Sequence, residues 1–257
     1  MGSTMLTLAA WNICHGGGRR LPRIILRLLD LDADVVALSE VRWPAAGQLI
    51  GILADHGWRW HAAARVGRGN GLLVLSRLPM CSEYGEHQKH AGHEEHGEHP
   101  PPTGGVRPSM LPCRCESGPG SPGRPLDLLA VHLPHEPRLR VAAWRGVERR
   151  ARAATGDLAV VGDFNAPPRG HPALAKADAV AMGRLASLGV VRVPAADPDG
   201  VTWRGNLGSA EIDGAFVSGR LRDRVSSVRI VAEALDERES DHAPIRVEVL
   251  AAGEKRK

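Results

Sequence analysis

The chain alternates short apolar runs, typical of buried strands, with segments in which apolar residues recur at helical spacing. Strands are predicted at 6–13, 33–40, 58–66, 70–78, 125–133, 160–163, 211–218, 225–231 and 243–250. Helices are predicted at 21–30, 44–56, 138–154 and 171–189, the last as one helix or two. The Gly-Arg-Gly-Asn turn at 67–70 predicts a hairpin, and the stretch 79–124 is predicted to be irregular.

Strands and helices mix along the whole chain, which has no internal repeat and no linker. This order predicts an α/β (α+β) fold with sheets inside and helices outside. We expect one domain over residues 5–250. Residues 1–4 are expected to be an expression remnant ahead of a native start at Met5.

Composition narrows the class of protein without deciding its function. A hydrophobic fraction of 43% and a charged fraction of 24% are ordinary for a globular chain. The net charge of +4, carried mostly by arginine, suits a polyanionic partner such as nucleic acid, but a GC-rich genome would give the same bias. The chain has neither an apolar run of about 18 residues nor a signal-peptide pattern, so we expect a cytoplasmic protein with no membrane partner. No protein partner can be inferred.

The four cysteines lack the paired spacing of a zinc site and are expected to be buried free thiols. They are Cys14, Cys81, Cys113 and Cys115.

A histidine-rich tract interrupts the pattern inside an insertion at about 85–109. Its histidines recur at every third residue, at His87, His90, His93, His96 and His99. Imidazole suits Zn²⁺ and Ni²⁺, so the tract could be an accessory metal site, or even the main function of a metal-binding scaffold. The alternative is a flexible polar insertion, because the tract has almost nothing apolar to bury.

Polar side chains recur where the predicted strands end. They are Asn12, Glu40, His132, Asp163, Asn165, Asp213, Asp241 and His242. Each alone could be a turn residue, a solvated acid or a helix cap. Together, acids and amides suit a hard cation such as Mg²⁺ or Mn²⁺, and histidine beside a carboxylate suits a phosphate. The set predicts metal-assisted phosphodiester hydrolysis.

Eight motifs, in order, resemble those of the endonuclease/exonuclease/phosphatase superfamily. They are W-N-I (11–13), L-S-E-V-R (38–42), G-L-L-V-L-S-R-L-P (71–79), A-V-H-L (130–133), V-G-D-F-N (161–165), V-T-W (201–203), E-I-D-G-A-F-V-S (211–218) and S-D-H-A-P-I (240–245). The resemblance implies a four-layer sandwich, in which two mixed β-sheets pack face to face between helices. It also implies an active site where strand ends meet.

The resemblance further implies a role for each strand-end residue. Glu40 would be the principal Mg²⁺ ligand, with Asn12 beside it and Asp241 contributing. Asp163 would orient or deprotonate the attacking water, and Asn165 would hold a phosphate oxygen.

Three further residues complete that assignment. Asp213 would pair with His242, whose imidazole would stabilise the pentacovalent phosphorus. His132 stands where the deoxyribonuclease and sphingomyelinase branches have histidine and apurinic endonucleases have tyrosine.

The chain departs from the family pattern at Cys14, which replaces an aspartate that many apurinic endonucleases carry. Cys14 is expected on the same strand face as Asn12, and together with His132 it argues against a dedicated apurinic endonuclease.

The substrate is less constrained than the chemistry. Arg42, Trp203 and Arg204 lie near predicted strand ends and are expected to bind substrate, although Trp203 could equally be a packing residue. The arginines of helix 138–154 could follow a phosphate backbone or lie on a solvated outer face. We expect a Mg²⁺-dependent nuclease acting on DNA, with Mn²⁺ as a substitute. The alternative is a phosphodiesterase or phosphatase of a small phosphorylated metabolite or lipid head group.

Overall fold

The computed structural model describes residues 5–64, 69–82, 88–89, 109–116, 125–166, 172–197, 200–206 and 208–251. The five tract histidines predicted as an accessory metal site lie outside these residues. None of the helices in the described part is long and apolar enough to cross a membrane.

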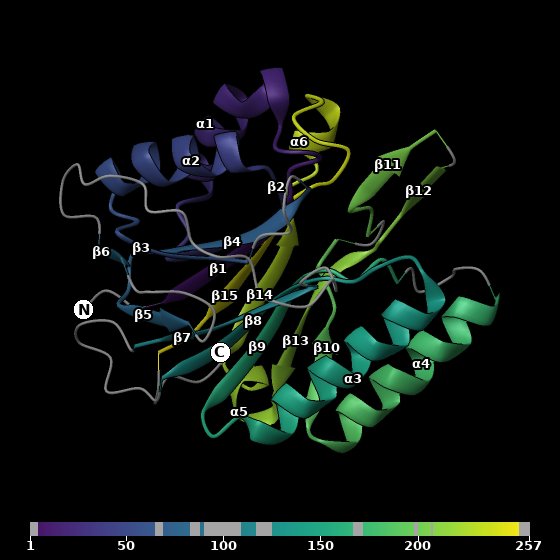
Figure 1. The fold of residues 1–257 in the computed structure, drawn as a ribbon. Coiled ribbons are helices and arrows are strands. Elements are labelled where there is room, and N and C mark those ends of the chain that lie inside the picture. Colours follow the sequence, from purple (N-terminus) through teal and green to yellow (C-terminus); the bar gives the residue numbers. More distant parts are fainter. Residues whose placement is uncertain are drawn as a thin grey trace.

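Two β-sheets pack face to face at the centre of the molecule (Figure 1). Across the first sheet, the described strands are β14 (Val225–Ile230), β15 (Ile245–Val249), β1 (Leu6–Asn12), β2 (Val35–Val41), β4 (Gly71–Ser76), β3 (Trp60–Ala64) and β6 (Gln88–Lys89). Across the second, they are β10 (Val190–Val193), β13 (Asp213–Ser218), β9 (Asp157–Asp163), β8 (Leu126–His132), β7 (Met110–Cys115) and β5 (Met80–Ser82). Both sheets are mixed, because β1 pairs parallel with β2 and β8 pairs parallel with β9.

Helices cover both outer faces of the paired sheets (Figure 1). The first sheet carries α1 (Leu21–Leu31), α2 (Trp43–Asp55) and α6 (Glu233–Asp236), with a short 3-10 turn η1 (Gly18–Arg20) before α1. The second carries α3 (Pro137–Ala153) and α4 (Pro172–Ser187), and α5 (Gly219–Arg222) follows β13. The segment 171–189 therefore contains one helix. This arrangement is the four-layer sandwich that the family resemblance implied.

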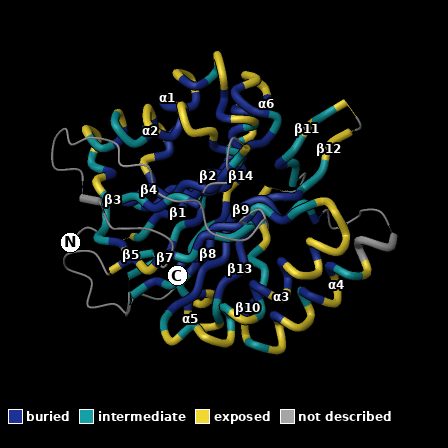
Figure 2. Tube along the Cα trace, viewed as in Figure 1, coloured by how far each residue is buried: buried dark blue, intermediate teal, exposed yellow. Residues whose placement is uncertain are grey.

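Strand alternation divides the core into three apolar layers, because successive side chains of a strand point to opposite faces. In β1, Leu8 and Ala10 face the second sheet, whereas Ala9 and Trp11 face α1 and α2. The second sheet contributes Leu128 and its neighbours to the central layer and a further layer beneath α3 and α4. Figure 2 shows buried strands between helices whose outer sides are exposed.

The structure corrects the prediction that 79–124 is irregular, since β5 and β7 lie within it. Strand β7 has the alternation of a half-buried strand, with Leu111, Cys113 and Cys115 buried. Pro112 in its middle obscures that pattern, because proline is unusual inside a sheet. Strand β10 and the hairpin of β11 (Trp203–Gly205) with β12 (Gly208–Ala210) were also not predicted.

The expectation of four buried thiols is wrong for two of them. Cys113 and Cys115 are buried, whereas Cys81 is exposed and Cys14 is half-buried. All four are free.

A buried ion pair connects the outer helices to the ends of the second sheet. Arg140 of α3 is only 2% exposed, and its guanidinium donates two hydrogen bonds, of 2.7 and 2.9 Å, to Asp178 of α4. The same guanidinium donates to the carbonyls of Pro134 (3.1 Å) and Phe164 (2.7 Å), which follow β8 and β9. Arg140 therefore belongs neither to a solvated outer face nor to a face that could follow a phosphate backbone, the two alternatives left open for the arginines of this helix.

Breaking this pair should destabilise the protein strongly. Arg140→Met should lower the free energy of unfolding by about 3–5 kcal/mol, because it leaves the carboxylate of Asp178 buried without its partner. The exposed pair Arg23–Glu237 (3.2 Å) provides the control, and Arg23→Met should cost at most about 1 kcal/mol. Urea denaturation measures both, and equal losses would contradict the structural role of Arg140.

Candidate active site

The polar strand ends gather at one edge of the sandwich because of strand direction. The parallel pair β1 and β2 carries Asn12 and Glu40 to this edge of the first sheet. The parallel pair β8 and β9 carries His132 and Asp163 to the same edge of the second sheet, where the two residues are register partners. Strand β13 runs the other way and begins there with Asp213, opposite Asp163. The packed sheets thus bring together residues far apart in the sequence.

Asn12 joins acids from the two sheets. Its side chain is buried, and Nδ2 donates to Glu40 Oε1 (3.2 Å) and to Asp163 Oδ2 (3.0 Å). Its Oδ1 accepts a hydrogen bond from the backbone N–H of Cys14 (3.0 Å), which fixes the orientation of the amide. The residue predicted as a metal ligand therefore presents its N–H groups to both acids, and its oxygen faces the following turn.

Behind this bridge lies a buried carboxylate–imidazole pair. His242 Nδ1 lies 2.9 Å from Asp213 Oδ2, and His242 Nε2 lies 3.9 Å from Asp163 Oδ2. Burial alone would lower the pKa of His242, but the charge and hydrogen bond of Asp213, with the charges of Asp163 and Asp241, raise that pKa to about 9. The imidazole is therefore protonated at neutral pH and presents positive charge to the site.

Asp163 is held rigidly in a tight turn. Its Oδ1 accepts from the backbone N–H of Asn165 (2.8 Å), and Asn165 Nδ2 donates to the carbonyl of Leu133 (2.8 Å). Burial raises the pKa of Asp163, as does the charge of Asp213, against the opposing effects of His242, His132 and Asn12.

The glycine before Asp163 is required by packing. Gly162 has φ of 135°, and a Cβ there would lie 2.1 Å from the carbonyl oxygen of Val131. Asn165 adopts φ of 48°, a left-handed conformation that asparagine tolerates better than most residues. The V-G-D-F-N motif thus has the residues that its turn demands.

Glu40 and His132 face the same space from opposite sheets. His132 Nε2 lies 3.8 Å from Glu40 Oε1 and 3.6 Å from Asp163 Oδ2. Glu40 has φ of 57° at an irregularity in the pairing of β2 with β4, between Ser39 and Val41. A left-handed glutamate inside a strand is a costly conformation of the kind that clusters at functional sites.

The loop that carries Asp241 is attached to the end of β1. Ser240 is buried, and its hydroxyl donates to the carbonyl of Asn12 (2.7 Å) and accepts from the backbone N–H of His242 (3.2 Å). Asp241 Oδ1 lies 3.3 Å from the same hydroxyl. Asp241 therefore lies at the margin of the site, next to the turn that follows β1.

The expectation that Cys14 shares a strand face with Asn12 is wrong. Strand β1 ends at Asn12, and Cys14 begins a turn in which it and the next four residues, through Gly18, all have positive φ. Burial raises the pKa of Cys14, and the neighbouring Asp241 acts in the same direction. The thiol is therefore neutral at pH 7 and a poor ligand for a hard cation.

The residues predicted to bind substrate surround this edge. Arg42 is exposed, and its Nε donates to Asn70 Oδ1 (3.3 Å). Trp203 forms a backbone bridge with His242, and its ring packs on Gly205, where a Cβ would lie 2.4 Å from it. Arg204 is also exposed and pairs with Asp236 at 3.0 Å. All three thus lie near the candidate site, with the Trp203 ring partly used in packing.

Sequence reasoning missed two residues that contact Glu40. His15 donates its backbone N–H to Glu40 Oε2 (3.0 Å), and its Nδ1 lies 2.9 Å from the same oxygen. Asn70 Nδ2 donates to Glu40 Oε2 at 2.9 Å. His15 lies in the turn after β1, and Asn70 lies just before β4. In the sequence each is only a polar residue beside a glycine, which is ordinary for a turn.

The donor set fits a divalent cation. Asp163, Asp213 and His242 offer ligand atoms that all lie within 4.8 Å of one another, and the carboxylate of Glu40 is nearby and 17% exposed. Such an oxygen-rich set suits a hard divalent cation. Because Asp213 and His242 already satisfy each other inside the protein, the accessible carboxylate of Glu40 is the better anchor for an ion that also contacts substrate.

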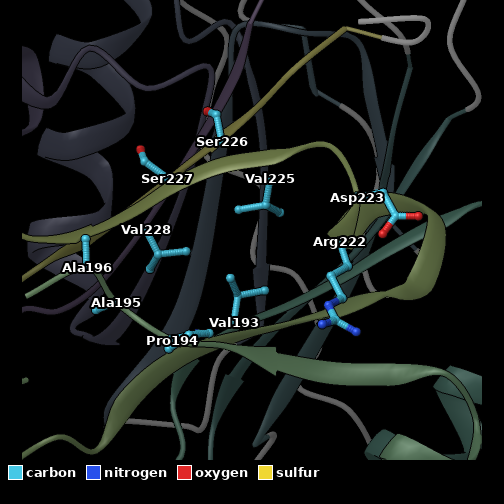
Figure 3. Close-up of a pocket in the computed structure, with 10 residues that line it drawn as sticks. All are labelled: Val193, Pro194, Ala195, Ala196, Arg222, Asp223, Val225, Ser226, Ser227 and Val228. Carbon is cyan, nitrogen blue, oxygen red and sulfur yellow. The ribbon is translucent and has the colours of Figure 1, made fainter. Parts of the chain in front are cut away.

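A separate hollow lies away from this edge. It is lined by residues of the segments 193–196 and 222–228, between the outer strands β10 and β14 of the two sheets (Figure 3). Valine and alanine side chains dominate its wall, and none of the candidate catalytic residues contributes to it. It is therefore separate from the strand-end chemistry.

The sequence profile of the Endonuclease/Exonuclease/phosphatase family matches residues 9–242, and the chain belongs to this family. Enzymes of this class are phosphoesterase hydrolases. A search of curated protein sequences gave no significant match.

Several solved structures share the fold of this chain. A 3′ phosphatase, NExo, from Neisseria, solved with a product DNA hairpin, is 18% identical, with a TM-score of 0.70 over 95% of this chain and 99% of the other. An AP endonuclease from Archaeoglobus fulgidus is 12% identical, with a TM-score of 0.69 over 94% and 98%. Truncated Caenorhabditis elegans TDP2 is 17% identical, with a TM-score of 0.65 over 96% and 98%. At these identities the likeness establishes the fold alone.

The raised pKa of His242 should depend on Asp213. Asp213→Asn should lower that pKa from about 9 toward the ordinary value of 6.5, because it removes the main charge that opposes burial. In the wild type the pair stabilises the fold fully below about pH 6.5, and this contribution is lost as pH rises through about 9. NMR titration of the imidazole measures the shift, with Asp236→Asn as an exposed control. An unchanged pKa in Asp213→Asn would refute the pairing.

Proposed function

We propose that this protein is a divalent-cation-dependent phosphodiester hydrolase that cleaves DNA, with Mg²⁺ as the working cation and Mn²⁺ as a substitute. One observation carries the proposal. Acids from two different sheets, Glu40 and Asp163, share the Nδ2 of Asn12 and lie beside a buried Asp213–His242 pair. Metal-assisted hydrolysis requires one acid that holds an ion, a second acid that activates a water, and a positive group, here an imidazolium, that stabilises charge on the phosphate.

In this proposal Glu40 holds the cation, Asp241 contributes from the margin of the site, and Asn12 positions the carboxylate of Glu40. The cation, when bound, polarises the phosphate and neutralises charge on it. Asn12 keeps the carboxylates of Glu40 and Asp163 at a fixed separation, because its single nitrogen donates to both.

Asp163 orients the attacking water and takes its proton at Oδ2. Burial raises the pKa of this carboxyl, which makes the carboxylate a stronger base than an exposed aspartate. Its Oδ1 accepts from the backbone N–H of Asn165, whereas Oδ2 is the oxygen that lies near the imidazoles of His132 and His242.

Positive charge and hydrogen-bond donors face the phosphate. His242, protonated at neutral pH, stabilises charge that develops on the phosphate oxygens, and Asp213 keeps its ring in one orientation. His132 lies between Glu40 and Asp163 and can donate to a phosphate oxygen through Nε2. Asn165 has a second Nδ2 hydrogen for the same purpose, since only one is used by Leu133.

DNA is the proposed substrate on two grounds. The net charge of +4 favours a polyanion, and Arg42 and Arg204 lie exposed near the site. The Neisseria enzyme NExo, which shares the fold, is a 3′ phosphatase and a 3′–5′ exonuclease, and the Archaeoglobus protein is an AP endonuclease.

Single substitutions should abolish most of the activity. Asp163→Asn, His242→Ala and Glu40→Gln should each reduce turnover on a labelled DNA duplex by at least about 10²-fold, because each removes a base, a charge-stabilising group or the cation anchor. Activity should also vanish in EDTA and return with Mg²⁺. Asp55→Asn, at the exposed end of α2, is the control and should retain activity. Wild-type turnover in any of the three site variants would refute its assignment.

Salt dependence should separate DNA from a small substrate. If DNA binds through several phosphates, log Kd should rise steeply and linearly with log salt, whereas a small phosphodiester should show a shallow dependence. Fluorescence anisotropy of a labelled duplex with the Asp163→Asn variant measures the slope without cleavage. A shallow slope, together with turnover of bis-nitrophenyl phosphate, would favour the small-metabolite phosphodiesterase.

The histidine-rich tract is proposed as an accessory Zn²⁺ or Ni²⁺ site within the catalytic domain at 5–250. Replacing its five histidines with glutamine should leave Mg²⁺-dependent turnover unchanged and remove Ni²⁺ affinity measured by calorimetry. Loss of hydrolysis in this variant would instead show that the tract is not accessory, and Ni²⁺ binding by a wild-type protein that hydrolyses no phosphodiester would favour the metal-binding scaffold.

A further inference from the structure

We propose that His15 supplies a nitrogen ligand to a cation on the Oε2 side of Glu40, so that this site binds Mn²⁺, the proposed substitute, more tightly than it binds the working cation Mg²⁺. The inference deepens the proposed function, because it concerns the cation that Glu40 holds, but it is independent of whether the substrate is DNA.

Glu40 Oε2 and His15 Nδ1 share one neighbour, the side-chain nitrogen of Asn70. Asn70 Nδ2 lies 2.9 Å from Glu40 Oε2 and 2.7 Å from His15 Nδ1. The other end of this amide is fixed, because Asn70 Oδ1 accepts a hydrogen bond from Arg42 Nε (3.3 Å). An N–H group of Asn70 therefore faces both atoms, and Nδ1 has a lone pair to offer when the ring carries its proton on Nε2. A carboxylate oxygen and an imidazole nitrogen that share one electropositive neighbour can share a cation.

The spacing of the two ligand atoms fits such an ion. His15 Nδ1 and Glu40 Oε2 are 2.9 Å apart. Two ligands at right angles, each about 2.1 Å from an octahedral ion, are separated by about 3.0 Å. The backbone N–H of His15 also donates to Oε2 (3.0 Å), which holds the ring beside the carboxylate.

The place is open to ions from solvent and separate from the buried acids. The side chain of His15 is 60% exposed, whereas that of Glu40 is 17% exposed. The other oxygen of Glu40, Oε1, accepts a hydrogen bond from Asn12 and lies 3.8 Å from His132 Nε2. The carboxylate thus has one oxygen toward the catalytic acids and one toward His15.

A nitrogen ligand changes which ion the site prefers. Mg²⁺ takes oxygen ligands, whereas Mn²⁺ and later first-row ions also accept imidazole, with affinity rising along the series. His15 therefore adds affinity for Mn²⁺ and little for Mg²⁺. Asn70 controls access to the two ligand atoms, because its side-chain amide contacts both of them and must rotate away when an ion enters.

Metal binding to the whole chain tests this inference without any measurement of hydrolysis. All variants carry glutamine in place of His87, His90, His93, His96 and His99, so that the tract cannot bind the titrant. Calorimetry with Mn²⁺ alone and with Mg²⁺ alone should give tighter Mn²⁺ binding in this background. His15→Gln should weaken Mn²⁺ binding about 10-fold and change Mg²⁺ binding less than about 2-fold. Asn70→Asp should tighten Mn²⁺ binding, because it replaces the N–H donor with an oxygen ligand.

Pulsed electron paramagnetic resonance of bound Mn²⁺ identifies the ligand directly. The background protein should show coupling to an imidazole nitrogen, and His15→Gln should lose it. His56→Gln, an exposed histidine after α2, is the matched control and should keep both affinity and coupling. Unchanged Mn²⁺ affinity in His15→Gln, or a coupling that is lost only in His132→Gln, would overturn the inference. Retained Mn²⁺ binding through His15 in a protein that hydrolyses no DNA would refute the proposed function and leave this inference standing.

Discussion

The candidate site depends on one hydrogen-bonding group, the side-chain amide of Asn12. A single nitrogen holds carboxylates that belong to different sheets, Glu40 and Asp163, and the amide oxygen is fixed by the turn after β1. Two like charges so close would repel each other in a buried setting unless a shared donor or a cation lay between them. The packing of the two sheets brings the two carboxylates together, and the N–H groups of Asn12 offset their repulsion without a bound ion.

Much of the fold could be predicted because strand alternation and helical spacing are written directly in the residue order. The strand ends were predictable for a related reason. A polar residue directly after a buried run, such as Asp163 or Glu40, is conspicuous in sequence, and parallel strands bring such ends to the same edge. Strand β7 was not predicted, because Pro112 and two cysteines hide an alternation that only neighbouring strands make plain.

The parts of the site that escaped prediction depend on backbone conformation or on helix rotation. His15 reaches Glu40 from the turn of Cys14 to Gly18, in which every residue has positive φ, and Asn70 reaches it from the turn before β4. No pattern of residue types specifies where such turns direct their side chains. Arg140 was grouped with the exposed arginines of α3 by charge. Its spacing from Ala143, Trp144 and Val147 places it on the buried face, a signal that charge counting overlooked.

Arg140 also has a consequence for how the molecule opens and closes locally. One guanidinium holds the chain just after β8, the chain just after β9 and the middle of α4. Local unfolding of α3 and α4 would therefore release the segments that follow β8 and β9 and present His132 and Asp163. Arg140 itself bonds to neither of these two residues but to the carbonyls just after them. We therefore expect amide hydrogen exchange in α4 and in the strand-end turns to behave as one cooperative unit, with the outer helices helping to keep the candidate site ordered.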